Sequence, residues 1–213
     1  MGGMKALTLD FSMIKPNELI LLLQRKFPGK RKRLRWTVFR AGGGKYTPQE
    51  SAVIQLLQIS EATAVPHSRI QTDVSQNVQL FPTLWSRFKT LNSLSYIMAN
   101  KEKNERGLDE IILLDHRGNI SEASMANIFW VTSGKYFTPS LNCGCINGIS
   151  RQVLIETLEI KSNPVEVREF KLEGLYDADQ VFITNSSGIS YLDTIINHKF
   201  STEPIELLTQ IFD

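Results

Sequence analysis

Three features of this 213-residue chain could do chemistry together: an amine, a carboxylate and an anion-binding loop. Lys89 precedes Glu122 by 33 residues, and the run Gly148-Ile149-Ser150-Arg151 lies directly before a stretch with helical periodicity. A lysine amine can bond to a carbonyl carbon and can move a proton, and a carboxylate stabilises a nearby positive charge. The N–H groups that open a helix favour an anion such as a phosphate. The sequence therefore predicts a placed carboxylate followed by a phosphate-binding loop, with Lys89 as a candidate amine.

Taken singly, each feature has a commoner structural explanation. A lone lysine is usually exposed to solvent, and a single carboxylate at the end of a strand is usually structural. The apolar neighbours Phe88, Leu91 and Leu94 predict that Lys89 is buried at the mouth of a helix, which would favour the neutral amine that Schiff-base chemistry needs. The functional interpretation is favoured because the features occur together and in one order.

The elements that must position these residues follow from hydrophobic periodicity. The expected strands are short apolar or alternating runs bounded by turn residues, at 33–38, 51–59, 69–80, 109–114, 127–131, 165–170 and 180–184, with a short strand that ends at 139. The expected helices cover 16–27, 91 to the charged run 101–107, 152–160, 172–175 and 205–212. Residues 185–189 are expected to form a polar loop that brings hydroxyl and N–H groups to an anion.

Several of these residues also fall into a known order. Glu122 and Asn127 match E-x-x-x-x-N-[IL]-F, a T-P pair follows at 138–139, and residues 148–151 match G-I-[ST]-R. This order resembles the signature of the class-IV aminotransferase family, the fold-type IV pyridoxal-phosphate enzymes. Lys89 and Asn92 stand in a K-x-x-N-x-L context that is similar to that of the family's catalytic lysine.

The resemblance implies an α+β fold of two domains: a small α/β domain, incomplete at its N-terminus, and a larger pseudo-barrel β domain with flanking helices. Residues 62–68 are polar, small and interrupted by Pro66, so they make the best linker. We therefore expect a partial small domain at 1–62 and a cofactor-binding domain at 63–213. Family members usually carry a further N-terminal segment that ends in an H-x-x-R-L motif, and this chain is expected to begin after it.

The resemblance also implies the cofactor, pyridoxal 5'-phosphate, and a role for each site residue. Lys89 would be the catalytic lysine that forms the Schiff base and moves the substrate's α-proton, and Glu122 would keep the cofactor's ring nitrogen protonated. Further cofactor contacts are implied for Asn92, Gly148, Ile149, Ser150 and Ser186. Substrate contacts are implied for Arg40 and Ser187, and a guanidinium suits a carboxylate because it presents a planar pair of donors.

The reaction is expected from the turn at 38–46, in which Arg40 follows an apolar strand and precedes three glycines. This turn resembles the lyase and D-amino-acid branches of the family and favours 4-amino-4-deoxychorismate lyase, which yields 4-aminobenzoate and pyruvate. A branched-chain or D-amino-acid transaminase is the alternative, and a truncated non-catalytic relic is an alternative of another class. The basic run 30–35 could suggest a nucleic-acid binder, but its alternation with Leu34 and Trp36 favours a strand with an exposed charged face.

Composition sets the expected partners. A net charge of +2 gives no reason to expect nucleic acid or an anionic membrane. The resemblance implies a small-molecule amino substrate and a homodimer. The apolar run 19–23 is too short to span a bilayer and the opening MGGMKALTLDF lacks signal-peptide features, which predicts a cytoplasmic protein. Cys143 and Cys145 are expected to be small packed residues rather than metal ligands, because the three histidines are scattered.

Overall fold

The computed structural model describes residues 2–12, 14–29, 32–62 and 66–212. The chain divides into two compact units, Met1–Ala64 and Val65–Asp213. Residues 63–65 of the predicted linker and residues 30 and 31 of the basic run lie outside the described residues. The domain boundary at residue 62 therefore stays a prediction.

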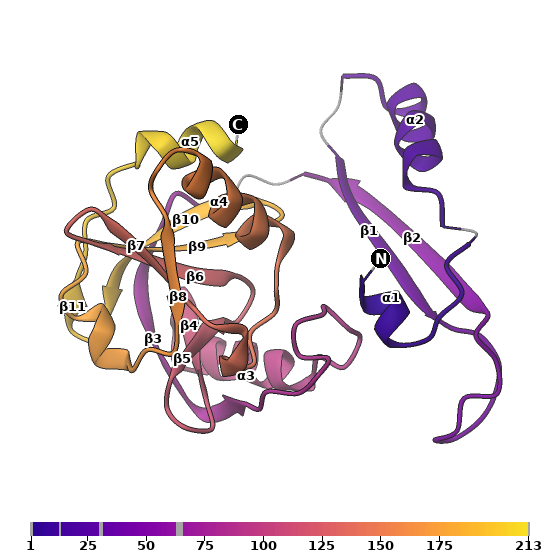
Figure 1. Ribbon diagram of the computed structural model, residues 1–213, viewed down its shortest axis with the longest axis horizontal. Coiled ribbons are helices and arrows are strands. Elements are labelled where there is room, and N and C mark those ends of the chain that lie inside the picture. Colours follow the sequence, from indigo (N-terminus) through magenta and orange to yellow (C-terminus); the bar gives the residue numbers. More distant parts are fainter. Residues whose placement is uncertain (1, 13, 30–31, 63–65, 213) are drawn as a thin grey trace. The chain divides into compact units, whose positions relative to one another are not determined.

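The small unit is built on a two-stranded antiparallel ribbon (Figure 1). Its elements are α1 (Gly2–Ala6), α2 (Pro16–Lys26), β1 (Lys32–Arg40) and β2 (Val53–Glu61). The two strands pair in unbroken register along their whole length, which confirms the strands expected at 33–38 and 51–59. Pro16 occupies the first turn of α2, where its missing N–H leaves no helical hydrogen bond unmade.

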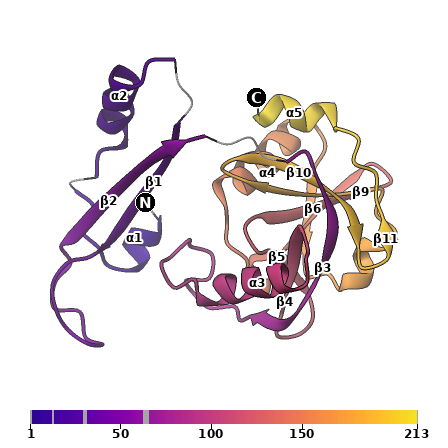
Figure 2. The ribbon, with the colours of Figure 1, turned by 180° about the vertical axis from the view of Figure 1, so that it is seen from behind.

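The large unit is a curled nine-stranded sheet (Figures 1 and 2). Its strands are β3 (Ser68–Leu80), β4 (Glu110–Asp115), β5 (Ile120–Ala123), β6 (Asn127–Thr132), β7 (Lys135–Pro139), β8 (Val165–Arg168), β9 (Gln180–Asn185), β10 (Gly188–Ile195) and β11 (His198–Lys199). The spatial order is β5-β4-β3-β10-β9-β6-β7-β8, with β11 paired to β10. The sheet is mixed, because β3 runs parallel to both β4 and β10, and β7 runs parallel to β8.

Helices cover the sheet at separate places. They are α3 (Leu94–Glu105), α4 (Ile149–Ile160) and α5 (Glu206–Phe212), with 3₁₀ turns η1 (Leu141–Cys143) and η2 (Leu172–Leu175). Helix α3 packs on β3 and β4, whereas α4 packs on β9 and α5. Figures 1 and 2 show α4 and α5 together, away from α3.

The core lies on both faces of the sheet, and β6 shows how the sequence produces this. Ile128 and Trp130 belong to one buried cluster, and Phe129 and Val131 belong to another. Alternate side chains of a strand point to opposite faces, so a continuous apolar run is required where both faces are buried. The second cluster includes Leu154 and Leu158 of α4 and Leu208 of α5, which explains why these helices are amphipathic.

The structure corrects four details of the predicted elements. Helix α3 begins at Leu94 rather than at residue 91, and α4 begins at Ile149 rather than at residue 152. The predicted loop 185–189 is a two-residue turn, because Asn185 already pairs with Gly188. Strand β10, which follows this turn and occupies the middle of the sheet, was not predicted.

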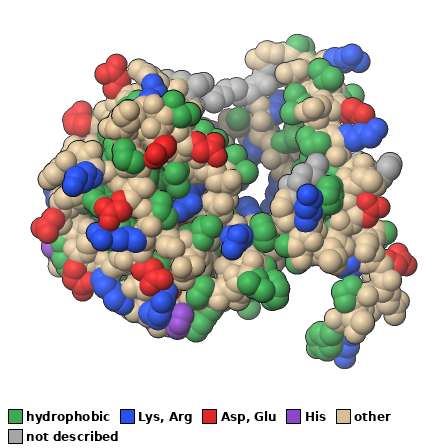
Figure 3. Space-filling model, in the orientation of Figure 1, with side chains coloured by type: hydrophobic (Ala, Val, Ile, Leu, Met, Phe, Trp, Pro, Cys, Tyr) green, Lys and Arg blue, Asp and Glu red, His purple; other side chains and the backbone are tan. Residues whose placement is uncertain are grey.

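The surface of the large unit carries both signs of charge. Figure 3 shows acidic and basic side chains interspersed over the face in view. No helix among the described residues is both long and apolar enough to cross a membrane.

Candidate active site

Glu122 lies on the short strand β5 with only 3% of its surface exposed. Tyr96 Oη donates a hydrogen bond to Oε1 at 2.6 Å, while Asn127 Nδ2 and the N–H of Ile146 donate to Oε2 at 3.2 and 3.1 Å. Burial raises the pKa of this carboxyl to about 7, although the hydrogen bonds from Tyr96 and Ile146 and the nearby cations act in the opposite direction. Glu122 can therefore be either protonated or ionised near neutral pH.

Asn127 joins Glu122 to the loop that precedes helix α4. Its Nδ2 also donates to the carbonyl oxygen of Ile146 at 2.6 Å. Gly148 is the N-cap of α4, and a Cβ at this position would collide with Asn127 Oδ1. Glycine is therefore required at position 148 as long as Asn127 keeps the orientation that binds Glu122.

The N-terminus of α4 is open to an anion. Gly148 has extended backbone (φ −61°, ψ 149°), and among the described residues no side chain caps the helix. The first N–H groups of a helix have no partner within it and lie at the positive end of its dipole. Ser150 Oγ donates to the carbonyl oxygen of Asn185 at 2.8 Å, which ties this helix end to the β9–β10 turn. Ser186 and Ser187 form that turn, and both are exposed.

Arg151 places a buried positive charge behind this loop. Its Nη1 donates to Asn147 Oδ1 at 3.1 Å and its Nη2 to the carbonyl oxygen of Pro139 at 3.0 Å. Among the described residues, Arg151 Nε has no hydrogen-bond partner. Burial lowers the pKa of this guanidinium, whose charge in turn lowers the pKa of Glu122.

Lys89 lies in an irregular segment between β3 and α3. Its side chain is exposed and α3 begins only at Leu94, so the predicted burial at the mouth of a helix is wrong in this structure. The expected apolar cover is missing because Leu91 and Leu94 are themselves 58% and 65% exposed. The Lys89 cation is nevertheless close enough to Glu122 to lower the pKa of that carboxyl.

Two contacts bring the Lys89 segment against the loop before α4. The N–H of Asn147 donates to the carbonyl oxygen of Arg87 at 2.9 Å. Gly144, in left-handed conformation with φ +84°, lies against the backbone of Phe81 and Pro82. The structure therefore brings together Lys89, Glu122 and the N-terminus of α4, which are separated in the sequence.

The other predicted site residues are exposed or belong to the small unit. Asn92 and Ile149 are exposed, and Ile149 has 76% of its surface accessible. Arg40 belongs to the small unit, where its guanidinium donates to the carbonyl oxygens of Leu7 and Glu50. Arg40 thus has a structural role within that unit, and its contact with substrate stays a prediction.

Two residues whose side chains donate to Glu122, Asn127 and Tyr96, had no role predicted from the sequence. Asn127 belongs to the E-x-x-x-x-N order, so its spacing from Glu122 was a signal that could have indicated a shared site. Tyr96 gave no such signal, because its contact with Glu122 depends on how α3 packs against the sheet.

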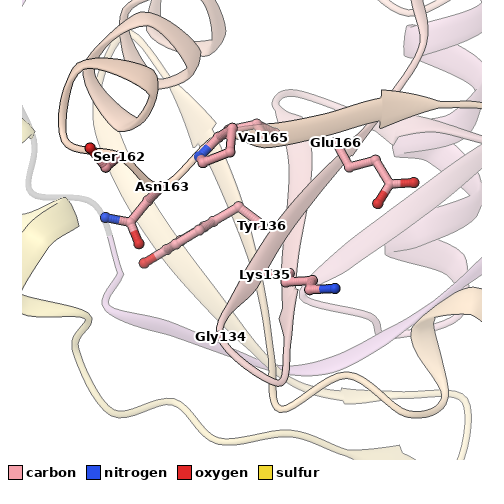
Figure 4. Close-up of a pocket in the computed structure, with 8 residues that line it drawn as sticks. Gly134, Lys135, Tyr136, Ser162, Asn163, Val165 and Glu166 are labelled. Atoms are coloured by element: carbon pink, nitrogen blue, oxygen red, sulfur yellow. The ribbon is translucent and has the colours of Figure 1, made fainter.

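Two other features lie apart from this site. A surface hollow of about 510 Å³ is lined by the start of β7, with Tyr136, and by the α4–β8 connection, with Asn163 (Figure 4). Its described lining contains no predicted site residue. Cys143 and Cys145 are buried, and burial raises their pKa values to about 11 and about 12. Among the described residues, no cluster of His, Cys, Asp and Glu could hold a metal ion.

Several solved structures of enzymes share this architecture. The branched-chain aminotransferase from Thermoproteus uzoniensis superposes with a TM-score of 0.88 at 21% identity, covering 98% of this chain and 74% of that one. The 4-amino-4-deoxychorismate lyase from Pseudomonas aeruginosa superposes with a TM-score of 0.84 at 23% identity, covering 99% and 79%. The fold is that of the fold-type IV aminotransferases, which confirms the predicted fold class.

The chain belongs to the amino-transferase class IV family, whose model matches residues 3–190. Aminodeoxychorismate lyase of Vibrio harveyi is 29% identical over 150 residues, which are 68% of this chain and 55% of the relative. D-alanine aminotransferase of Listeria monocytogenes is 34% identical over 106 residues, which are 48% of this chain and 36% of the relative. The chain thus spans about half or less of the length of these curated relatives.

Enzymes of this family depend on pyridoxal phosphate, and the branched-chain aminotransferase of Thermobaculum terrenum was solved in its pyridoxal-phosphate form. The residues described above fit that cofactor. Glu122 offers a buried carboxylate to a ring nitrogen, and Lys89 offers an amine. The uncapped N-terminus of α4 and the exposed hydroxyl of Ser186 offer donors to a phosphate.

Proposed function

We propose that this chain acts as a pyridoxal-phosphate-dependent lyase that converts 4-amino-4-deoxychorismate into 4-aminobenzoate and pyruvate. The observation that carries the proposal is the buried Glu122 carboxylate, held by three donors beside the Lys89 charge and the loop before α4. The sequence match to the Vibrio harveyi lyase supports the lyase reaction, because it covers 68% of this chain, against 48% for the D-alanine aminotransferase.

The proposed roles follow from the chemistry of each group. When bound, pyridoxal phosphate supplies an electron sink for the carbanion formed at the substrate's α-carbon. Lys89 Nζ would hold the cofactor covalently and would move the substrate's α-proton, first as base and then as acid. Glu122 would accept a hydrogen bond from the ring nitrogen and would stabilise its positive charge.

The phosphate and the substrate are assigned to the two turns that Ser150 ties together. The first turn of α4, with Gly148, Ile149 and Ser150, binds the phosphate, and Ser186 adds a hydroxyl from the β9–β10 turn. Ser187 lies next to the substrate. Asn92 adds a cofactor contact from the Lys89 segment, Arg40 binds the substrate carboxylate, and the active form is a homodimer.

A transaminase for branched-chain or D-amino acids is the second candidate, because the transaminase from Thermoproteus uzoniensis superposes as well as the lyase does. The two reactions are separated by supplying 4-amino-4-deoxychorismate and cofactor without any keto-acid acceptor. The lyase proposal predicts that pyruvate and 4-aminobenzoate appear in equal amounts. Amino transfer from a branched-chain or D-amino acid to a keto acid, with no pyruvate from the chorismate derivative, would favour the transaminase.

A further inference from the structure

Tyr96 reaches Glu122 from the first turn of helix α3. Its Oη donates to Glu122 Oε1 at 2.6 Å, the shortest of the three hydrogen bonds to this carboxylate. The half-buried ring packs against one cluster of apolar residues, which are Val78, Leu80, Ala99, Ile111 and Leu113. Apolar packing thus holds the ring in place, and the hydroxyl donates to the carboxylate.

The three donors leave a specific part of Glu122 unused. A carboxylate offers about four acceptor positions, two on each oxygen. Oε2 accepts from both Asn127 and Ile146, whereas among the described residues Oε1 accepts from Tyr96 alone. One acceptor position therefore remains on Oε1, beside the Tyr96 hydroxyl.

The ionisable groups that face Glu122 come from each element packed around it. They are Tyr96 from α3, Lys89 from the segment before it, Cys145 from the loop after η1, and Arg151 from α4. Burial raises the pKa of Tyr96 well above its usual value and that of Cys145 to about 12, so both stay protonated at neutral pH. Tyr96 is consequently a hydrogen-bond donor throughout the range in which Glu122 titrates.

We propose that Tyr96 is a positioning residue for Glu122: its hydroxyl orients the carboxylate, favours the ionised form, and leaves one position on Oε1 for the ring nitrogen of the cofactor. This inference rests on the proposed function, because it takes Glu122 as the partner of that nitrogen. A purely structural Tyr96 would pack its ring against the apolar cluster that includes Val78 and Ala99, and would not affect the charge of Glu122.

The direct test is the substitution Tyr96→Phe, which removes the hydroxyl and keeps the ring. Carbon-13 NMR of the Glu122 side chain follows its ionisation in the cofactor-free protein. Loss of a donor to the carboxylate should raise the midpoint by about one pH unit. The matched control is Tyr136→Phe, which removes the hydroxyl of a buried tyrosine on β7 and should leave the midpoint unchanged. An unchanged midpoint in Tyr96→Phe would overturn the proposal.

A second readout concerns the cofactor. The affinity for pyridoxal phosphate, measured by titration, should fall about tenfold in Tyr96→Phe but not in Tyr136→Phe, and the loss should vanish in a Glu122→Gln background. If the wild-type protein binds no pyridoxal phosphate, the proposed function fails and the cofactor-side role of Tyr96 fails with it. If the wild type binds pyridoxal phosphate and Tyr96→Phe binds it equally well, only the role proposed for Tyr96 is excluded and the proposed function stands.

A measurement on the unsubstituted protein covers the case in which Tyr96→Phe does not fold. With ring-carbon-labelled tyrosine, the Cζ signal of Tyr96 should shift in one step with a midpoint near that of Glu122, because the acceptor of its hydrogen bond changes charge. Tyr136 should show no such step. A Tyr96 signal that stays constant while Glu122 titrates would contradict the proposal.

Discussion

Glu122 is buried where an ionised carboxylate is unfavourable, and its neighbours only partly offset that cost. Its pKa is raised from 4.5 to about 7. Between these two values the folded protein binds a proton that the unfolded chain has already lost. The free energy of unfolding should therefore fall as the pH rises through this window, by on the order of 3 kcal/mol from this group alone.

The substitution Glu122→Gln should remove this contribution while keeping the fold. The amide oxygen can accept from Ile146 and Asn127, and the amide NH₂ can donate to the Tyr96 oxygen, so each neighbour keeps a partner. Urea unfolding at several pH values should show the wild type losing stability relative to Glu122→Gln between about pH 4.5 and pH 7. Parallel stability curves would mean that Glu122 titrates normally. In single turnover, Glu122→Gln should also slow α-proton removal, because a neutral amide cannot stabilise the pyridinium charge.

Gly148→Ala tests whether the loop before α4 and Glu122 form one unit. The added methyl group would collide with Asn127 Oδ1, so Asn127 must move away from Glu122 and from the Ile146 carbonyl. We expect a loss of about 1–3 kcal/mol in the free energy of unfolding and weaker binding of pyridoxal phosphate. The control is Gly174→Ala, whose methyl group would make an ordinary contact of 3.8 Å with Phe170. If both substitutions changed stability and cofactor binding equally, the inference that the loop before α4 and Glu122 form one unit would be contradicted.

Some residues of the site could be predicted from the sequence and others could not. Glu122, Asn127 and Gly148 fall in an ordered motif, so their association could be predicted. Tyr96 could not be found, because its contact depends on the packing of α3. The exposure of Lys89 was missed because apolar neighbours such as Leu91 predict burial, and those neighbours are themselves exposed.

At the scale of elements, helix α3 is joined by hydrogen bonds to an irregular part of strand β3. The pairing of β3 with β4 shifts register between Val74 and Gln79. Glu102 of α3 accepts hydrogen bonds from Ser75 Oγ and from the N–H groups of Gln76 and Asn77, at 2.6, 2.8 and 3.2 Å. One carboxylate thus satisfies the backbone donors that the register shift frees from the sheet, and it also fixes the helix that carries Tyr96.

Glu102→Gln should therefore destabilise the protein by about 2–3 kcal/mol, because a single amide oxygen cannot replace two carboxylate oxygens. Burial would raise the pKa of Glu102, but hydrogen bonds outweigh it and lower the pKa to about 2. The stabilisation is thus present above about pH 4.5 and lost as the pH falls toward 2. Exposed Glu105, paired to Lys101 at 3.7 Å, provides the control: Glu105→Gln should change stability by less than about 0.5 kcal/mol. Equal unfolding midpoints for the two variants would refute this role of Glu102.

Helices and strands could be predicted where burial of one or both faces requires a regular pattern of apolar residues. The residues at which they begin and end were less predictable. The apolar run of β6 predicted a strand because both of its faces are buried. Strand β10 was missed because Asn185-Ser186-Ser187-Gly188 has the composition of a loop, although the chain forms a two-residue turn there and continues as a strand. Helix α3 begins late because apolar periodicity starts at Leu91 while the backbone becomes helical only at Leu94.

At the scale of the whole molecule, the segment that carries Lys89 is unusually apolar for a surface. Its exposed side chains include Phe81, Leu84 and Trp85, of which Leu84 is 77% exposed, and Leu94 and Ile97 are exposed at the start of the adjoining helix α3. Contiguous exposed apolar side chains commonly mark an interface between proteins. A second copy that covered this segment would also bury Lys89, as its neighbours in the sequence predicted.

The proposed homodimer can be tested through this segment. Sedimentation of the wild type should show a dimer, and Leu84→Glu should raise its dissociation constant at least about tenfold, because a charge would be placed in an apolar contact. Ile160→Glu is the matched control, since Ile160 is 83% exposed at the end of α4. A monomeric wild type would contradict the homodimer, and equal dissociation constants for both variants would place the interface elsewhere.

The central claim is that Lys89 is the residue that holds the cofactor covalently, and reductive trapping tests it most directly. The protein is mixed with pyridoxal phosphate, reduced with borohydride and digested, and the labelled peptide is identified by mass spectrometry. We predict a single label on Lys89, which is absent from Lys89→Ala. A label on Lys45, Lys101 or Lys171 instead, or equal labelling of Lys89→Ala, would contradict the claim.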